Sequence, residues 1–201
     1  MSEPDPAALE RRAALAVDGP TVVDDTIRAR RTSLLVDAER PVPPVLLGRM
    51  IEAATWAPNH KRTWPWRFTT FTGDARARLG AAMAEVAEMN GVEPARVAKL
   101  RTKYTRSSTV VLVWVVRDPD PLRAREDRDA TAAAVQNLLL SATANGLGSY
   151  WGSIPDDLVG AVRGVAGVDD RHDPVALVYV GWPTGTVTPP ERPKPHVDQL
   201  D

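Results

Sequence analysis

The sequence predicts an α+β fold in which helices cover both faces of one mixed β-sheet. Residues 110–116 are an unbroken run of Val and Leu with one Trp, which is typical of a strand buried on both faces. Residues 131–144 are small and apolar nearly all round, which predicts a central buried helix. Further strand and helix patterns alternate along the chain, so the sheet should lie between two helical layers.

The first third of the chain predicts three helices. The first, over residues 6–17, should end near Asp18-Gly19-Pro20. The second covers residues 22–30, where apolar side chains spaced four apart share one face. The third covers residues 44–56, because a proline suits its first turn and an apolar stripe follows.

The middle of the chain predicts two strands and two helices. Residues 66–72 alternate well enough for a strand, and residues 110–116 form the buried strand. Between them, residues 76–89 form an alanine-rich amphipathic helix that stops at Asn90-Gly91, and a short helix covers residues 94–103.

The last third completes the core. The charged segment 123–129 is expected to be a solvated helix start ahead of the buried helix 131–144. Strands over 149–152 and 175–180 flank a helix over 155–163. The proline-rich tail from residue 181 should not fold alone and is expected to wrap over a second subunit.

Composition excludes several classes of function. The chain has 201 residues, no cysteine, three histidines and a net charge of −1. Disulfides, thiolate chemistry and cysteine metal sites are therefore excluded, and a histidine metal site is not expected. The near-neutral charge argues against nucleic acid or an anionic membrane as a partner. No secretory signal or membrane-spanning run is found, so we expect a cytoplasmic protein whose redox chemistry, if it has any, needs an organic cofactor.

The segment Arg30-Arg31-Thr32-Ser33 follows the second predicted helix and has two interpretations. Basic residues at the end of a helix complement its dipole, and Thr-Ser simply starts a turn. Alternatively, guanidinium and hydroxyl donors side by side form a phosphate clamp.

The loop over residues 57–68 concentrates three cations, a histidine, two tryptophans and two prolines. It could be a packed aromatic surface loop, in which Trp66 and Phe68 are structural and the charges are solvated. It could instead hold a flat anionic ligand, with His60 among the contacts.

The glycine-rich turn over residues 145–153 also has two interpretations. Gly146 and Gly148 are explained by a helix C-cap and a tight turn. Alternatively, the glycines let backbone N–H groups approach a ligand closely. The turn follows a helix rather than a strand, so it is no dinucleotide fingerprint.

Together these elements resemble the FMN-dependent nitroreductase family. Arg30-Arg31-Thr32-Ser33 is similar to its Arg-Arg-Ser element, and Ala57-Pro58-Asn59-His60-Lys61 through Pro65-Trp66-Arg67-Phe68 resembles its Ala-Pro loop. The central helix and glycine turn up to Trp151, and Gly181-Trp182-Pro183, are also similar. The Ala-Pro-x-His-Lys form resembles the compact bacterial YdjA-like branch.

The resemblance implies a three-layer α/β/α fold with a mixed, mainly antiparallel sheet. It covers residues 22–195 as one FMN-binding domain, with residues 1–21 as an extension and 196–201 as a tail. It also implies an intertwined homodimer with FMN in each of two interface pockets.

The same resemblance implies the roles of individual residues. Arg30 and Thr32 would hold the phosphate, and Arg31 the ribityl chain or pyrimidine edge. His60 would approach from the partner subunit, and Arg192 would be a late phosphate-binding cation. On the other side of the flavin would lie a second group: Trp151, Gly152 and Ser153.

The chain departs from the family pattern at Leu34, where many members carry a cation that reaches the flavin N1/O2 edge. Arg31, Lys61 or Arg62 could replace that charge. Trp64, in place of a polar loop residue, would make the substrate mouth more aromatic.

The implied activity is FMN-dependent NAD(P)H oxidation, with hydride passing through flavin N5 to nitro, quinone or related small-molecule acceptors. The flavin would perform the chemistry, so no catalytic side chain and no metal are expected. Two alternatives stay open: a protein that binds or sequesters flavin without turnover, and an enzyme of the same fold with other flavin chemistry, such as dehalogenation, enoate reduction or flavin breakdown.

Overall fold

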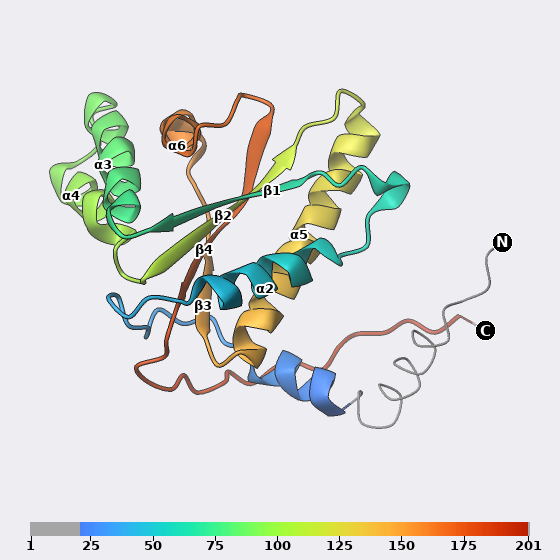
Figure 1. Ribbon diagram of the computed structural model, residues 1–201. Helices are drawn as coiled ribbons and strands as arrows, with labels where there is room; N and C mark the ends of the chain where they lie inside the picture. Colours follow the sequence, from blue (N-terminus) through green and yellow to red (C-terminus); the bar gives the residue numbers. More distant parts are fainter. Residues whose placement is uncertain (1–20, 201) are drawn as a thin grey trace.

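Four strands form one sheet at the centre of the computed structural model, which describes residues 21–200 (Figure 1). The strands are β1 (Trp66–Thr72), β2 (Thr109–Val116), β3 (Gly148–Gly152) and β4 (His172–Gly181), in the order β1-β2-β4-β3. All three pairs are antiparallel, and an isolated parallel bridge joins Thr32 to Ser149. The predicted α+β fold is confirmed.

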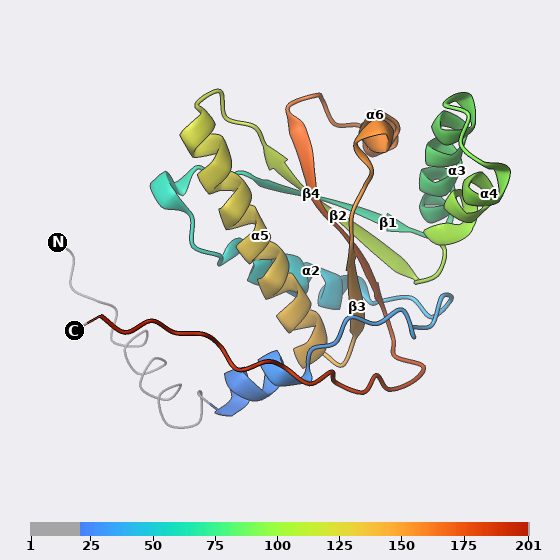
Figure 2. The same ribbon diagram turned by 180° about the vertical axis from the view of Figure 1, so that it is seen from behind.

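One face of the sheet is covered by α2 (Pro44–Thr55) and the long helix α5 (Pro121–Ala144) (Figures 1 and 2). Val111 and Val113 of β2 point into this core, and Leu138 of α5 packs there. Because β2 is buried along nearly its whole length, its other side chains must meet a second layer.

The second layer consists of α3 (Asp74–Met89), α4 (Pro94–Lys103) and α6 (Val159–Ala166) on the opposite face. Leu112 and Trp114 of β2 and Tyr179 of β4 pack against it. The sheet is therefore sandwiched between two helical layers, as the sequence predicted.

Local sequence explains where the helices begin. Pro94 occupies the first turn of α4, and the Glu93 carboxylate accepts hydrogen bonds from two backbone N–H groups of that turn. Asp120 caps α5 by accepting from the Arg123 N–H at 2.9 Å. The charged segment 123–129 is thus the first part of α5, which begins ten residues before the predicted buried helix at 131–144.

Other predicted boundaries shift only slightly. Residues 21–29 are helical, α3 begins at Asp74 rather than 76, and β4 begins at His172 rather than 175. The predicted helix 155–163 is a short 3₁₀ turn, η2 (Asp156–Leu158), followed by α6. The predicted helix 6–17 lies outside the described residues.

Candidate functional site

The Arg30-Arg31-Thr32-Ser33 segment is held against the edge of the sheet. The Ser33 N–H donates to the Ser149 carbonyl at 2.9 Å, where β3 begins. Three residues further along, Val36 packs against Gly148, where a Cβ would lie 2.7 Å from Cγ1 of Val36. The start of β3 therefore contacts the segment that directly follows the arginines, which neither sequence interpretation of the glycine turn included.

Arg31 satisfies the structural interpretation of this segment. Its guanidinium donates to the carbonyls of Arg28 and Arg30, the latter at 2.7 Å, at the end of the helix over residues 21–29. A cation bonded to the last carbonyls of a helix complements its dipole.

Arg30, Arg31 and Arg192 nevertheless meet in one cavity of about 460 Å³. The proline-rich tail passes beside the helix over residues 21–29 and supplies Arg192, and Gln136 of α5 completes the wall. The described residues that line the cavity include no carboxylate; they are Ile27, Arg28, Arg30, Arg31, Gln136, Pro189, Pro190 and Arg192. Such a lining suits a phosphate, because guanidinium groups bind its oxygens in pairs.

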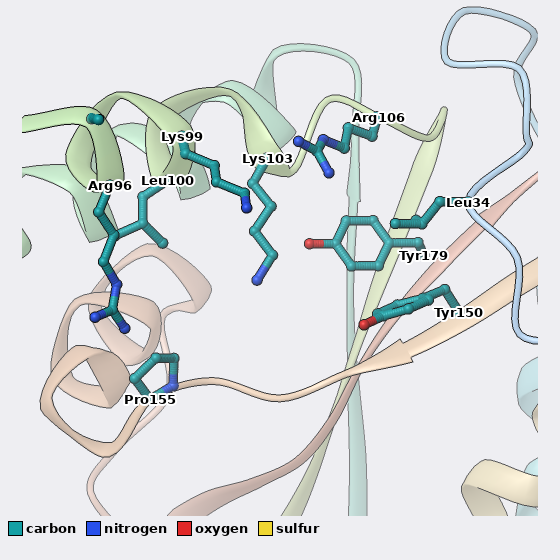
Figure 3. Close-up of a pocket in the computed structure, with 10 residues that line it drawn as sticks. Leu34, Arg96, Lys99, Leu100, Lys103, Arg106, Tyr150, Pro155 and Tyr179 are labelled. Atoms are coloured by element: carbon teal, nitrogen blue, oxygen red, sulfur yellow. The ribbon is translucent and has the colours of Figure 1, made fainter.

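Leu34 lines a second and larger cavity of about 620 Å³ (Figure 3). Four cationic side chains line it: Arg96, Lys99, Lys103 and Arg106. Arg31, Lys61 and Arg62, which the sequence offered as replacements for the missing cation, are not among the described residues that line it. Of the four, Arg106 lies with Leu34 at one end of the cavity, and Arg96 lies at the other (Figure 3).

Three of the four cations could have been found in the sequence. Arg96, Lys99 and Lys103 recur at i, i+3 and i+7 within the predicted helix 94–103, so they share one face. Only the fold shows that this face looks toward residue 34.

Tyr150 and Tyr179 line the larger cavity, and Tyr104 packs behind Tyr179. Tyr179 stacks on Tyr104 with ring centroids 6.2 Å apart, and Tyr150 meets Tyr179 edge-on at 5.7 Å. The hydroxyls of Tyr104 and Tyr179 are buried and have no hydrogen-bond partner among the described residues. Burial raises the pKa of Tyr104 to about 12 and raises the pKa of Tyr179 further, so both are neutral donors.

The neighbouring cations in this cavity destabilise the charged form of Lys103. Its pKa is lowered, first by burial and then by repulsion from Lys99 and Arg106. An anion in the cavity would relieve that repulsion.

The predicted residues on β3 lie at the edge of the sheet. Trp151 is 38% exposed, and Gly152 ends the strand. Ser153 instead lines a third cavity of about 410 Å³, together with Arg128 of α5 and Asp173 of β4. The structure thus separates Ser153 from the cavity of the paired arginines.

His60 lies in the short 3₁₀ turn η1 (His60–Arg62), which packs on α5. Its Nδ1 is 2.9 Å from Oε2 of Glu126. It lines none of the three cavities within the chain. The predicted approach from a partner subunit therefore stays a prediction.

The loop that carries His60 is strained. Lys61, Arg62 and Trp64 have φ angles of 62°, 54° and 50°, a left-handed conformation that costs non-glycine residues energy. The buried carboxylate of Asp127 accepts hydrogen bonds from the side chains of Asn59 and Thr63. These bonds hold the loop in its strained conformation. As expected, Trp66 is buried and Phe68 packs on the core.

Neither a metal cluster nor a membrane span is found in the part of the chain that the structure describes. No three His, Asp or Glu side chains there gather in a metal-binding arrangement, and no helix there is long and apolar enough to cross a bilayer.

Comparison with known proteins identifies the family. The family profile described as "Nitroreductase family" matches residues 27–182, which is most of the chain. The chain belongs to the nitroreductase family.

Named relatives agree with this assignment. "Putative NAD(P)H nitroreductase YfhC" of Bacillus subtilis is 32% identical over 167 residues, which cover 81% of this chain and 85% of the relative. "Putative NAD(P)H nitroreductase YdjA" of Escherichia coli is 26% identical over 140 residues, covering 68% and 75%. The resemblance to the YdjA-like branch is confirmed.

A solved structure shows the same fold. The FMN-dependent nitroreductase NfnB of Mycobacterium smegmatis, in complex with NADPH, superposes with a TM-score of 0.66 at 18% identity, covering 83% of this chain and 90% of NfnB. At this identity the likeness concerns the fold alone.

Proposed function

We propose that this nitroreductase-family protein is an FMN-dependent NAD(P)H oxidoreductase that reduces nitro, quinone or related acceptors. The names of YfhC and YdjA support the electron donor, and NfnB supports both FMN and NADPH. The observation that carries the proposal is the pair of cationic cavities joined by residues 30–34.

The two cavities fit the two ends of a flavin mononucleotide. Arg30, Arg31 and Arg192 would bind the phosphate in the smaller cavity. Residues 30–34 span at most about 13 Å, since an extended chain covers about 3.3 Å per residue. Lys103 and Arg106, at the Leu34 end, would place positive charge beside the pyrimidine edge of the ring.

Bound FMN would supply the hydride chemistry between NAD(P)H and the acceptor. The side chains of the protein would then bind the flavin, orient it and polarise its ring. Trp151 and Gly152 lie at the sheet edge, where an exposed aromatic ring and a bare backbone can contact a flat ligand.

We further propose that two copies of the chain form each site, with His60 contributed by the partner. Apolar side chains on the helix over residues 21–29 support this, because Val22, Val23 and Ile27 are 63%, 51% and 48% exposed. A second copy would bury them.

The first experiment is the visible spectrum of the purified protein before and after NADH or NADPH. A yellow protein that bleaches and reoxidises with a quinone or nitroarene supports the proposal. A yellow protein that does not oxidise NAD(P)H would favour flavin binding without turnover. A colourless protein that takes up no added FMN would overturn it.

Replacing Arg30 tests the phosphate cavity. Arg30→Ala should weaken FMN binding by about 1.5–3 kcal/mol, or about 10- to 150-fold, because a charge-assisted contact is lost. Arg78→Ala, which removes an exposed arginine from α3, is the matched control. Equal FMN affinities in the two variants would contradict the assignment.

A further inference from the structure

The larger cavity carries positive charge well beyond its Leu34 end. Arg96, Lys99 and Lys103 form a row along α4, about 10 Å long at 1.5 Å per residue. Figure 3 shows Leu34, Tyr150 and Arg106 at one end of the cavity and Arg96 with Pro155 at the other. If Lys103 and Arg106 serve the flavin, then Arg96 and Lys99 remain for another ligand.

Acidic side chains do not neutralise this row among the described residues. None of the four cations forms an ion pair there, whereas Arg101 of the same helix pairs with Glu88 at 3.8 Å. The nearby Glu93 carboxylate is occupied by capping α4. Asp157 shares a small neighbouring cavity with Arg96 without forming an ion pair.

A buried donor also faces the same space. Tyr179 is 1% exposed, and its hydroxyl has no partner among the described residues. Figure 3 shows this hydroxyl directed toward the lysines of α4. A buried hydroxyl without a partner costs stability, so an acceptor atom of a ligand would complete the site.

We propose that Arg96 and Lys99 form a subsite for a phosphate or carboxylate group on the substrate that exchanges electrons with the flavin. This assignment rests on the proposed function and adds the chemical class of the substrate. The apolar walls at Leu100 and Pro155 would hold the body of that substrate, and the row would select molecules with negative charge.

The test compares Arg96→Gln and Lys99→Gln with Arg101→Gln, which removes a cation from the same helix but outside the cavity. The probes are two matched pairs: 4-nitrobenzoate against 4-nitrobenzyl alcohol, and NADPH against NADH. Each cavity variant should raise KM for the charged member of at least one pair about three- to tenfold, because both cations are partly hydrated. KM for the neutral acceptor, or for NADH, should stay within about twofold.

The pair that responds identifies the source of the anion. A changed benzoate-to-alcohol ratio assigns the subsite to the acceptor, and a changed NADPH-to-NADH ratio assigns it to the phosphate of the donor. Calorimetric titration of FMN-loaded protein with 4-nitrobenzoate or with NADP⁺ gives a readout independent of turnover, and the same variant should weaken the responding ligand.

Two failures are distinguishable. FMN-loaded, active protein in which Arg96→Gln and Lys99→Gln behave like Arg101→Gln in every ratio and titration overturns the subsite alone. Protein that binds no FMN overturns the proposed function, and with it the assignment of this anion to an electron-transfer substrate.

Discussion

Asp127→Ala should destabilise the protein through the strained loop that carries His60. Asp127 is 2% exposed on α5, and its carboxylate accepts hydrogen bonds from the Thr63 hydroxyl and, at 3.3 Å, from the Asn59 amide. The Asn59 side-chain oxygen in turn accepts from the Trp64 N–H at 2.8 Å. One buried carboxylate therefore holds both ends of the loop.

The magnitude follows from these contacts. A hydrogen bond to a charged group is worth about 1.5–3 kcal/mol, and the longer amide contact adds about 1 kcal/mol. Relief of the left-handed strain at Lys61, Arg62 and Trp64 returns part of this, since each such residue stores about 1 kcal/mol or more. We expect a net loss of about 2–4 kcal/mol, which for a chain of this size lowers Tm by about 4–15 °C.

Chemical denaturation gives the free energy of unfolding, and amide hydrogen exchange reports on the loop. Exchange over residues 59–66 should accelerate in Asp127→Ala, while β2 stays protected. Asp127→Asn keeps an acceptor oxygen and should recover part of the loss. Asp129→Ala removes an exposed carboxylate two residues along α5 and is the control. If Asp127→Ala and Asp129→Ala are equally stable, and loop exchange is unchanged, the reasoning is refuted.

Three further substitutions test the packing and charge around the larger cavity and helix α4. Gly80→Ala should cost about 1–3 kcal/mol, because its Cβ would lie 2.4 Å from the Arg101 carbonyl oxygen, whereas Gly164→Ala in α6 meets nothing within 4 Å and should be neutral or stabilising; thermal melts of the two variants compare them. Tyr179→Phe should raise the stability of ligand-free protein by about 1 kcal/mol in urea titration, since it removes a buried hydroxyl without a partner; a marked loss would mean that the hydroxyl is satisfied. Lys103→Gln should melt above the wild type at neutral pH without ligand, because the lowered pKa means that charged Lys103 costs stability below its folded pKa. That advantage should shrink as pH rises toward 10.5, where the unfolded lysine also loses its proton, so a difference in Tm that grows with pH would contradict it.

Particular elements show how far the sequence leads. Strand 110–116 was predicted nearly to the residue, because a run of β-branched residues suits only a strand with apolar neighbours on both faces. The start of α5 was predicted to within two residues from the charged segment 123–129, whereas the buried helix pattern alone begins ten residues later, at 131. The expectation that this segment is solvated was wrong at Asp127, which is 2% exposed. Periodicity reports burial, whereas a helix can run beyond the part of it that is buried.

Part of the candidate site could likewise be predicted from the sequence, and part of it could not. The arginine pair and the glycine turn were visible as motifs, but only the structure shows that Gly148 makes room for Val36. Arg192 is 162 residues from Arg30, and only the course of the tail brings the two into one cavity. Lys103 and Arg106 lie about 70 residues from Leu34, so no local pattern connects them.

The sequence by itself determined the layered α+β architecture, the nitroreductase family and the exclusion of cysteine chemistry. Those properties depend on composition, periodicity and short motifs, which act over a few residues. Only the tertiary structure decided which cations share a cavity, because charge adds up over distances in space and not along the chain. Antiparallel pairing of β4 with both β2 and β3 sets Tyr179 beside Tyr150, and the packing of α3, α4 and α6 on that face encloses them under a row of positive charge.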